Sequence, residues 1–226
     1  MSSITCNVAA FCLIGSVPLA AYAQVALVEG INSKTAGVEF MEYVPVGREI
    51  RLGKQDTLSL GYLKSCWHET ITGGIVTVGN EQSDVRSGKV DRHRVDCDGG
   101  KLALTAQQAS QSAGMVVRDL KPRPQASLEP QITIYGVSPV VEIKGGGPLL
   151  IERIDQPGER HEITIAAPQL VKGAFYDLAH TNTPLTPGGT YRASVGTRQI
   201  VFKVDARAKP GASPIISRLL RIQPGT

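Results

Sequence analysis

The residues best suited to chemistry lie together in one stretch of the chain, residues 65–100. This stretch begins with Cys66-x-His68 and ends with His93-x-x-x-Cys97. Thiolates and imidazole nitrogens are the usual ligands of structural zinc, so these residues form a candidate Cys2His2 metal site, although Cys66-x-His68 is closer than the usual ligand spacing. The alternatives are a disulfide between the two cysteines, or free thiols that act as a redox sensor.

The N-terminus helps to choose between these alternatives. Residues 1–23 contain no Asp, Glu, Lys or Arg, and an apolar run over 8–20 is followed by Ala21-Tyr22-Ala23. This pattern predicts a secretory signal peptide that is cleaved before Gln24, although the region ahead of the apolar run lacks the usual Lys or Arg. A buried N-terminal helix is the alternative interpretation.

Export would determine the state of the cysteines. Cleavage removes Cys6 and Cys12 and leaves only Cys66 and Cys97. Two remaining cysteines in an oxidising compartment usually pair. We therefore expect a disulfide, which closes a loop of about 30 residues and stabilises the fold by about 3–4 kcal/mol. No second apolar run of about 20 residues occurs, so we expect a soluble periplasmic or secreted protein without a cofactor.

No catalytic motif is present in the sequence. The pairs His68-Glu69 and His161-Glu162 each begin like the metalloprotease motif H-E-x-x-H, but neither has a histidine at the fifth position. The nucleophile motif G-x-S-x-G does not occur. We therefore expect no catalytic residues. Trp67 and Glu69 remain candidate binding residues, and for Trp67 packing in a core is the alternative role.

The composition indicates an all-β protein and excludes one class of partner. Aromatic residues make up 5% of the chain, while 24 glycines and 14 prolines supply many turn positions. This composition is typical of short strands joined by turns. The formal net charge is only +4 and is evenly spread, whereas proteins that bind nucleic acid concentrate their Lys and Arg on one face. We expect no nucleic-acid partner.

The first half of the chain shows the alternation of apolar and polar residues that is typical of strands. Residues 47–53 and 57–62 each alternate, and Gly73-Gly74 stands between two β-branched runs as in a hairpin turn. Residues 101–105 predict a further strand, and residues 106–112 predict a short helix.

A proline-rich segment over 121–130 predicts a linker between a module at 24–120 and a module at 131–226. We expect the two modules to fold independently. Residues 175–180 predict a helical turn, and residues 215–222 suit either a helix or a strand. The strands expected in the second module are 132–135, 140–144, 149–154, 162–166, 191–195 and 200–205.

A corner motif in the second module carries a family resemblance. The residues Leu185, Pro187, Gly188 and Tyr191 form the pattern L-x-P-G-x-x-Y, which precedes an alternating strand. This pattern resembles the corner between two strands in fibronectin type III and immunoglobulin-like sandwiches. The resemblance implies a β-sandwich in which the tyrosine hydroxyl bonds to nearby backbone. The core tryptophan of the fibronectin family is missing from this half.

The first module resembles a second family. Gly47-Arg48-Glu49-Ile50, then Leu58-Ser59-Leu60, then residues 70–79 follow a progression that is similar to the FecR-type β-rich domains of bacterial envelope proteins. The resemblance implies a domain that relays signals or takes part in assembly at the envelope.

These observations predict an all-β protein in which a small disulfide-closed β domain is followed by an immunoglobulin- or fibronectin-like β-sandwich. The first functional hypothesis is a non-enzymatic binding or adaptor protein that engages another envelope protein. The second is a periplasmic redox or metal sensor that uses Cys66, His68, His93 and Cys97. The third is an enzyme that acts on an envelope polymer.

Overall fold

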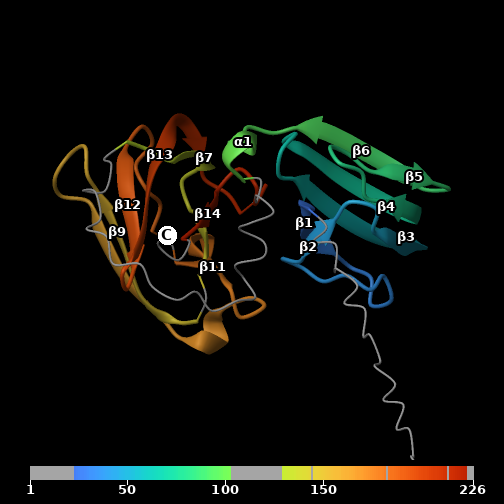
Figure 1. The fold of residues 1–226 in the computed structure, drawn as a ribbon, viewed down its shortest axis with the longest axis horizontal. Coiled ribbons are helices and arrows are strands. Elements are labelled where there is room, and N and C mark those ends of the chain that lie inside the picture. Colours follow the sequence, from blue (N-terminus) through green and yellow to red (C-terminus); the bar gives the residue numbers. More distant parts are fainter. Residues whose placement is uncertain (1–22, 103–128, 144, 182, 213, 223–226) are drawn as a thin grey trace, which may run out of the picture.

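The computed structural model describes residues 23–102, 129–143, 145–181, 183–212 and 214–222. Within these ranges the chain forms strands that gather into three sheets, and each helix is no longer than about one turn. The expected all-β class is confirmed. Figure 1 shows a first group of strands from the N-terminal half beside a second group from the C-terminal half.

Several regions discussed above fall outside these ranges. They are the predicted signal peptide apart from Ala23, the predicted helix over 106–112, the linker up to residue 128, and Lys144. The strand predicted over 101–105 is wrong at its start, because Lys101 and Leu102 belong to the short helix α1 (Gly99–Leu102). Its remaining residues are not described.

The first module is one antiparallel sheet in the order β2-β1-β3-β4-β5, with β6 also pairing with β4. Alternate side chains of β3 and β4, such as Leu58, Leu60 and Ile71, are buried in the core of this module. Burial of one face explains why the period-2 pattern was visible in the sequence. The strands are β1 (Gln24–Ile31), β2 (Tyr43–Pro45), β3 (Glu49–Tyr62), β4 (Trp67–Thr77), β5 (Asp84–Arg86) and β6 (Lys89–Arg94).

The predicted hairpin turn at Gly73-Gly74 is wrong. Strand β4 runs straight through both glycines, whose φ angles are 66° and 84°. They lie at a β-bulge of the β3–β4 pair, in which residues 53–56 of β3 stand opposite Gly73. A Cβ at Gly74 would clash with the backbone of Arg86 and Gly88 on the neighbouring segment. Positive φ serves a tight turn and a bulge equally well, which explains the error. The chain reverses at residues 78–83 instead.

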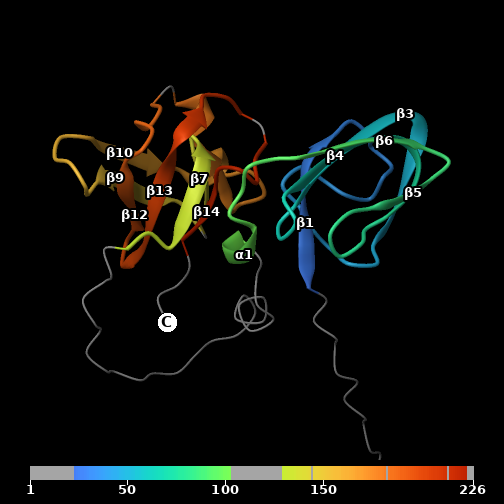
Figure 2. The ribbon, with the colours of Figure 1, turned by 90° about the horizontal axis from the view of Figure 1, so that it is seen from above.

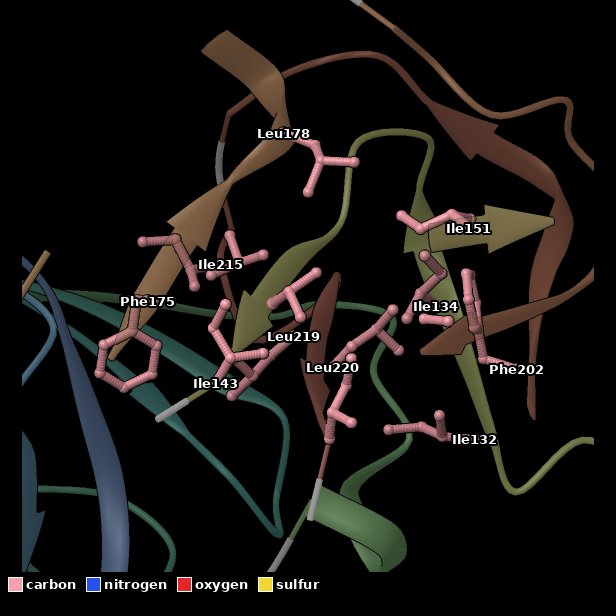
Figure 3. Packing of buried hydrophobic residues seen from close by; sticks show 14 of the residues in the cluster. Ile132, Ile134, Ile143, Ile151, Phe175, Leu178, Phe202, Ile215, Leu219 and Leu220 are labelled. Atoms are coloured by element: carbon pink, nitrogen blue, oxygen red, sulfur yellow. The ribbon is translucent and has the colours of Figure 1, made fainter. Parts of the chain in front are cut away.

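The second module consists of two sheets that pack as a sandwich. Their orders are β10-β9-β12-β13-β7 and β11-β8-β14, and the pairs β7–β13 and β8–β14 are parallel. Figure 3 shows Ile134, Ile151 and Phe202 of the larger sheet near Leu219 and Leu220 of the smaller one. The strands are β7 (Ile132–Gly136), β8 (Val140–Glu142), β9 (Gly147–Arg153), β10 (Arg160–Ile165), β11 (Phe175–Asp177), β12 (Thr190–Val195), β13 (Arg198–Lys209) and β14 (Leu219–Arg221).

Most strand predictions for this module are confirmed, with ends that shift by a few residues. Each of the six predicted ranges overlaps an observed strand. The ambiguous range 215–222 contains strand β14, and the range 175–180 is strand β11 followed by the 3-10 turn η2 (Leu178–His180). A second 3-10 turn, η1 (Ala167–Gln169), follows β10.

The two modules share buried contacts. Leu27 and Leu63 of the first module belong to the same hydrophobic cluster as Ile215 and Ile216 of the second. The carboxylate of Glu29 accepts hydrogen bonds from the backbone N–H groups of Ile215 and Ile216, at 2.8 and 2.7 Å. Figure 2 shows the modules side by side, with helix α1 near their junction. Each module therefore has its own sheets, and the two modules also share a buried interface.

Candidate functional site

Cys66 and Cys97 form the expected disulfide, with their Cα atoms 5.7 Å apart. Cys66 lies in the turn between β3 and β4, and its carbonyl accepts a hydrogen bond from the N–H of Val95 at 2.9 Å. Gly99 packs so closely that a Cβ there would clash with the Lys64 carbonyl. The disulfide therefore fixes the segment after β6, residues 95–98, against the first module.

The structure does not assemble the Cys2His2 metal site. The two sulfur atoms are bonded to each other, so neither is available as a thiolate ligand. The rings of His68 and His93 contact each other across β4 and β6, with centroids 5.1 Å apart. Nε2 of His68 lies 3.4 Å from the Glu29 carboxylate at the module interface. Within the described ranges, no three His, Cys, Asp or Glu side chains converge to hold a metal ion.

The surroundings of Glu69 indicate that it stabilises the fold and does not bind a ligand. Its side chain is fully buried, and its carboxylate accepts hydrogen bonds from Arg92 Nε at 2.6 Å and from the Ser83 N–H at 3.1 Å. A carboxylate without exposed surface is not available to contact a ligand. Trp67 packs partly against the core of the first module, and the guanidinium of Arg94 lies 5.1 Å from its ring centre. Trp67 therefore supports the position of Arg94.

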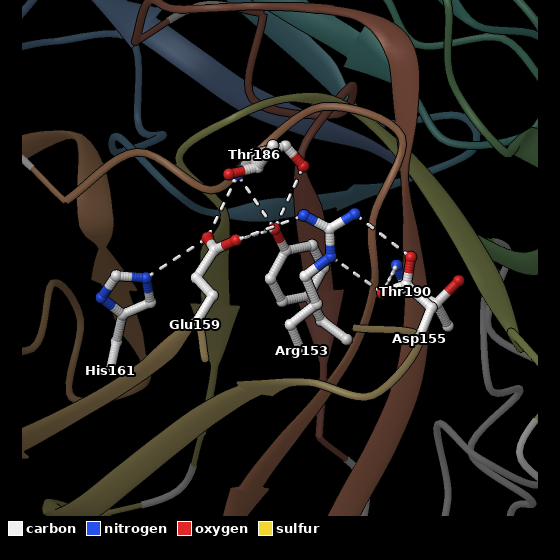
Figure 4. A network of polar contacts seen from close by, with 7 residues as sticks. Arg153, Asp155, Glu159, His161, Thr186 and Thr190 are labelled. Atoms are coloured by element: carbon white, nitrogen blue, oxygen red, sulfur yellow. Dashed lines mark hydrogen bonds and ion pairs between the residues drawn. The ribbon is translucent and has the colours of Figure 1, made fainter. Parts of the chain in front are cut away.

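The corner motif of the second module has the hydrogen bond that the resemblance implies. The Tyr191 hydroxyl accepts a hydrogen bond from the Thr186 N–H at 2.9 Å and donates one to Glu159 at 2.7 Å (Figure 4). Leu185 is buried, and Pro187 and Gly188 form the turn, in which Gly188 has a φ of 83°. Burial, and then the Glu159 carboxylate, raise the pKa of Tyr191.

The charged groups around this corner are hydrogen-bonded or ion-paired to one another. Burial would raise the pKa of Glu159, but hydrogen bonds from Tyr191 and Thr186 hold it below its usual value. The side-chain hydrogen bond from Arg153 lowers the pKa of Asp155 to about 2. His161 Nε2 lies 3.5 Å from Glu159 (Figure 4). The cluster resembles an acid–base site in composition, but its acceptors are occupied, so we assign it a structural role.

A groove of about 370 Å³ lies where the two modules meet. One wall is the segment after β6, and the other walls come from β7, from the end of β13 and from the loop before β14. The register of β13 against β7 shifts between Val204 and Lys209, which gives the intervening residues a different path from a regular ladder. The charged and aromatic residues that line the groove are Arg94, Asp96, Tyr135, Asp205, Arg207, Lys209 and Arg218.

The charges in the groove are partly paired. The Asp205 carboxylate accepts hydrogen bonds from the Arg207 N–H at 2.8 Å and from its Nε at 3.2 Å, and this contact lowers the pKa of Asp205. The contact with Asp205 and the charge of Asp96 raise the pKa of Arg207. Burial, and then nearby carboxylates, raise the pKa of Tyr135. The phenol is therefore neutral at physiological pH and can donate a hydrogen bond.

Arg218 forms a rigid part of the groove lining. Its side chain is 1% exposed and donates to both carboxylate oxygens of Asp177, at 2.6 and 2.8 Å. It also donates to the carbonyl of Ser138 at 2.7 Å. Burial would raise the pKa of Asp177, but the hydrogen bonds and the charge of Arg218 hold it below its usual value. A bidentate pair of this kind fixes the buried guanidinium in one position.

Strand β6 leads directly into the groove. It pairs with β4 on one side, and among the described strands none pairs with its other side. In Figure 1, β6 lies along the upper rim of the first sheet and continues toward α1. Its last residue, Arg94, also lines the groove. The free edge of β6 and the groove therefore form one surface, which we call the β6 surface.

The sequence offered little sign of this surface. Its walls come from three separate segments, at residues 94–96, 135–136 and 205–218, and their meeting depends on how the modules pack. Two short mixed-charge patterns, Arg94-Val95-Asp96 and Asp205-Ala206-Arg207, are its only local signal. Patterns of this length are common on solvated surfaces, so they could not identify a site by themselves.

Comparison with known proteins assigns no relative to this chain. No family model, no curated protein and no solved structure matches it. In the described residues, no helix has the length and apolar character needed to cross a membrane.

Proposed function

We propose that this chain is exported to the bacterial envelope and acts there as a non-enzymatic adaptor that binds another envelope protein through the β6 surface. The observation that carries this proposal is the continuity between the free edge of β6 and a groove built by both modules. An edge strand presents unpaired backbone N–H and C=O groups to which a strand of a partner can add. The groove would then hold side chains of the same partner.

Two observations support export. The N-terminal sequence has the apolar run and the Ala21-Tyr22-Ala23 pattern of a cleaved signal peptide. The disulfide between Cys66 and Cys97 is a bond that forms and persists mainly in oxidising compartments. Together these observations favour the periplasm or the outside of the cell.

The hydrogen bonding of three carboxylates favours binding over catalysis. Glu69, Glu159 and Asp177 each accept hydrogen bonds from an arginine, a tyrosine or the backbone, and so they are held in place as acceptors. A general base needs a free lone pair that faces a substrate. These three carboxylates therefore serve the fold, and an enzyme acting on an envelope polymer is the less favoured hypothesis.

The disulfide supports a second candidate function, a redox-responsive form of the same adaptor. The bond fixes residues 95–98, and Val95 and Asp96 line the groove. Reduction by a dithiol would yield two thiols here and a disulfide on the reductant, and it would release this wall. Comparing partner binding by oxidised and reduced protein separates the two functions: equal affinity rejects the redox-responsive form.

Photo-crosslinking tests the proposal. A photoreactive residue is placed at Val90, which is 37% exposed on β6, and the full-length protein is made in its native bacterium. The matched control places the same residue at Thr164, which is exposed on the edge strand β10. We expect one envelope protein to crosslink from Val90 and not from Thr164. Identical adducts from both positions, or protein that stays in the cytoplasm with Met1 intact, would contradict the proposal.

A further inference from the structure

The charges of the β6 surface identify the chemistry of its partner. We infer that the partner presents an extended segment that carries carboxylate side chains, adds as a strand to β6 and places carboxylates beside Arg94 and Lys209. This inference rests on the proposed adaptor function and specifies the partner that the function requires.

The geometry of β6 suits strand addition. Its six residues are in continuous antiparallel register with β4, from the pair Lys89–Thr72 to the pair Arg94–Trp67. This ladder occupies one side of β6 and fixes its extended backbone before any partner arrives. Preorganisation of this kind lowers the entropic cost of adding another strand. Beyond Arg94, the disulfide holds the chain as it enters the groove.

The cations of the groove exceed its anions. Arg207 is shared between Asp205, which it contacts, and the nearby charge of Asp96. Among the described residues, neither Arg94 nor Lys209 forms an ion pair; Arg94 instead stacks on Trp67. Arg218 is already neutralised by Asp177. The groove therefore has an uncompensated positive charge.

The strand itself adds no negative excess. Arg92 is paired with the buried Glu69, and the exposed Lys89 balances the exposed Asp91. A partner segment with carboxylates would thus meet an attractive potential, concentrated at the end of β6 where Arg94 lies. Charge complementarity at an interface mainly sets specificity and association rate. A lysine-rich segment of the same shape would be disfavoured.

Designed peptides test the inference. The probe is a synthetic ten-residue peptide of alternating Thr and Val with two Glu residues near one end, added to the oxidised mature protein. Two control peptides replace Glu by Lys, or place Pro at the centre to block the ladder. Calorimetry gives the affinity, and backbone amide NMR shifts locate the site. We expect shifts in β6 and in the groove, and binding that weakens as salt increases.

Charge variants complete the test. Loss of one exposed ion pair weakens binding by about 1.4- to 5-fold, and Lys209→Glu also adds a like-charge repulsion of similar size, so binding of the Glu peptide should weaken by about two- to thirtyfold. Arg160→Glu, on the edge strand β10, is the matched control and should leave affinity unchanged. Amide spectra of both variants verify that they are folded.

The inference is overturned if the Lys peptide binds as well as the Glu peptide, if the shifts fall on β10, or if Lys209→Glu binds with parental affinity. Those results leave a Val90-specific crosslink, and with it the adaptor function, intact. Conversely, an absent crosslink with normal binding of the Glu peptide would reject the adaptor function and retain the preference for carboxylates.

Discussion

At the scale of single residues, buried charges decide which side chains stabilise the fold. Glu69 has no exposed surface and satisfies both Arg92 and the Ser83 N–H. Changing Glu69 to Gln removes the charge and leaves donors poorly paired, which should lower the free energy of unfolding by about 2–4 kcal/mol.

Urea denaturation of the Glu69→Gln variant measures this loss. The control is Glu49→Gln, which disrupts exposed ion pairs with Arg51 and Arg86 and should cost about 0.5 kcal/mol or less. Equal losses in the two variants would show that the Glu69 contacts do not stabilise the folded state as argued.

A second prediction at this scale concerns acid. The pKa of Asp155 falls from 3.8 to about 2 in the folded state, because Arg153 hydrogen-bonds to its ionised form. A group with a lowered folded pKa stabilises the protein above its unfolded pKa, and that contribution is lost as the pH falls toward the folded pKa. Stability should therefore decrease between about pH 4 and pH 2. Asp155→Asn should reduce this slope in acid titrations monitored by circular dichroism, and an unchanged slope would contradict the assignment.

At the scale of elements, the glycines in β4 control the path of the sheet. Gly74 has a φ of 84°, and a Cβ there would clash with backbone, whereas Gly145 has a φ of 75° with open space around it. Gly145→Ala should therefore cost only the conformational term of about 1–2 kcal/mol. Gly74→Ala should cost clearly more in thermal or urea unfolding, because backbone must also move. A smaller loss at Gly74 than at Gly145 would argue against the bulge.

The strands were largely predictable because their signal is local. Alternation in residues 57–62 and 191–195 reflects burial of one face, and burial is what the sequence encodes most directly. The role of Gly73-Gly74 was not predictable, because the choice between turn and bulge depends on β5 and β6 pairing across from it. The disulfide was predictable from cysteine count and expected compartment.

The candidate site was less accessible to sequence reasoning than the strands. The predicted cluster of Cys66, His68, His93 and Cys97 lies beside the module interface, but the disulfide removes its thiolates. Arg94, which does line the groove, was not singled out. A surface formed by the packing of two modules produces no periodic sequence pattern in either module.

At the scale of the whole molecule, the interface should couple the two modules. Glu29 is the polar centre of this interface, since its carboxylate accepts from two backbone N–H groups of the second module. The shared core argues against the independent folding expected from the proline-rich linker, and we expect one unfolding transition for the parent protein.

Changing Glu29 to Ala leaves both N–H groups without their partner and should lower stability by about 2–4 kcal/mol. Scanning calorimetry should then show either a lower single transition or two separated ones. Two transitions already present in the parent protein would instead support independent modules and contradict the coupling.

The central claim, that a partner adds to the free edge of β6, is tested most directly by amide hydrogen exchange of the full mature protein with its purified crosslinking partner. Our account predicts slower exchange for amides of residues 89–94 in the complex, with the amides of β10 unchanged, because a new ladder would bond the outer edge of β6. Protection confined to other segments, with β6 exchanging as fast as in the free protein, would contradict it.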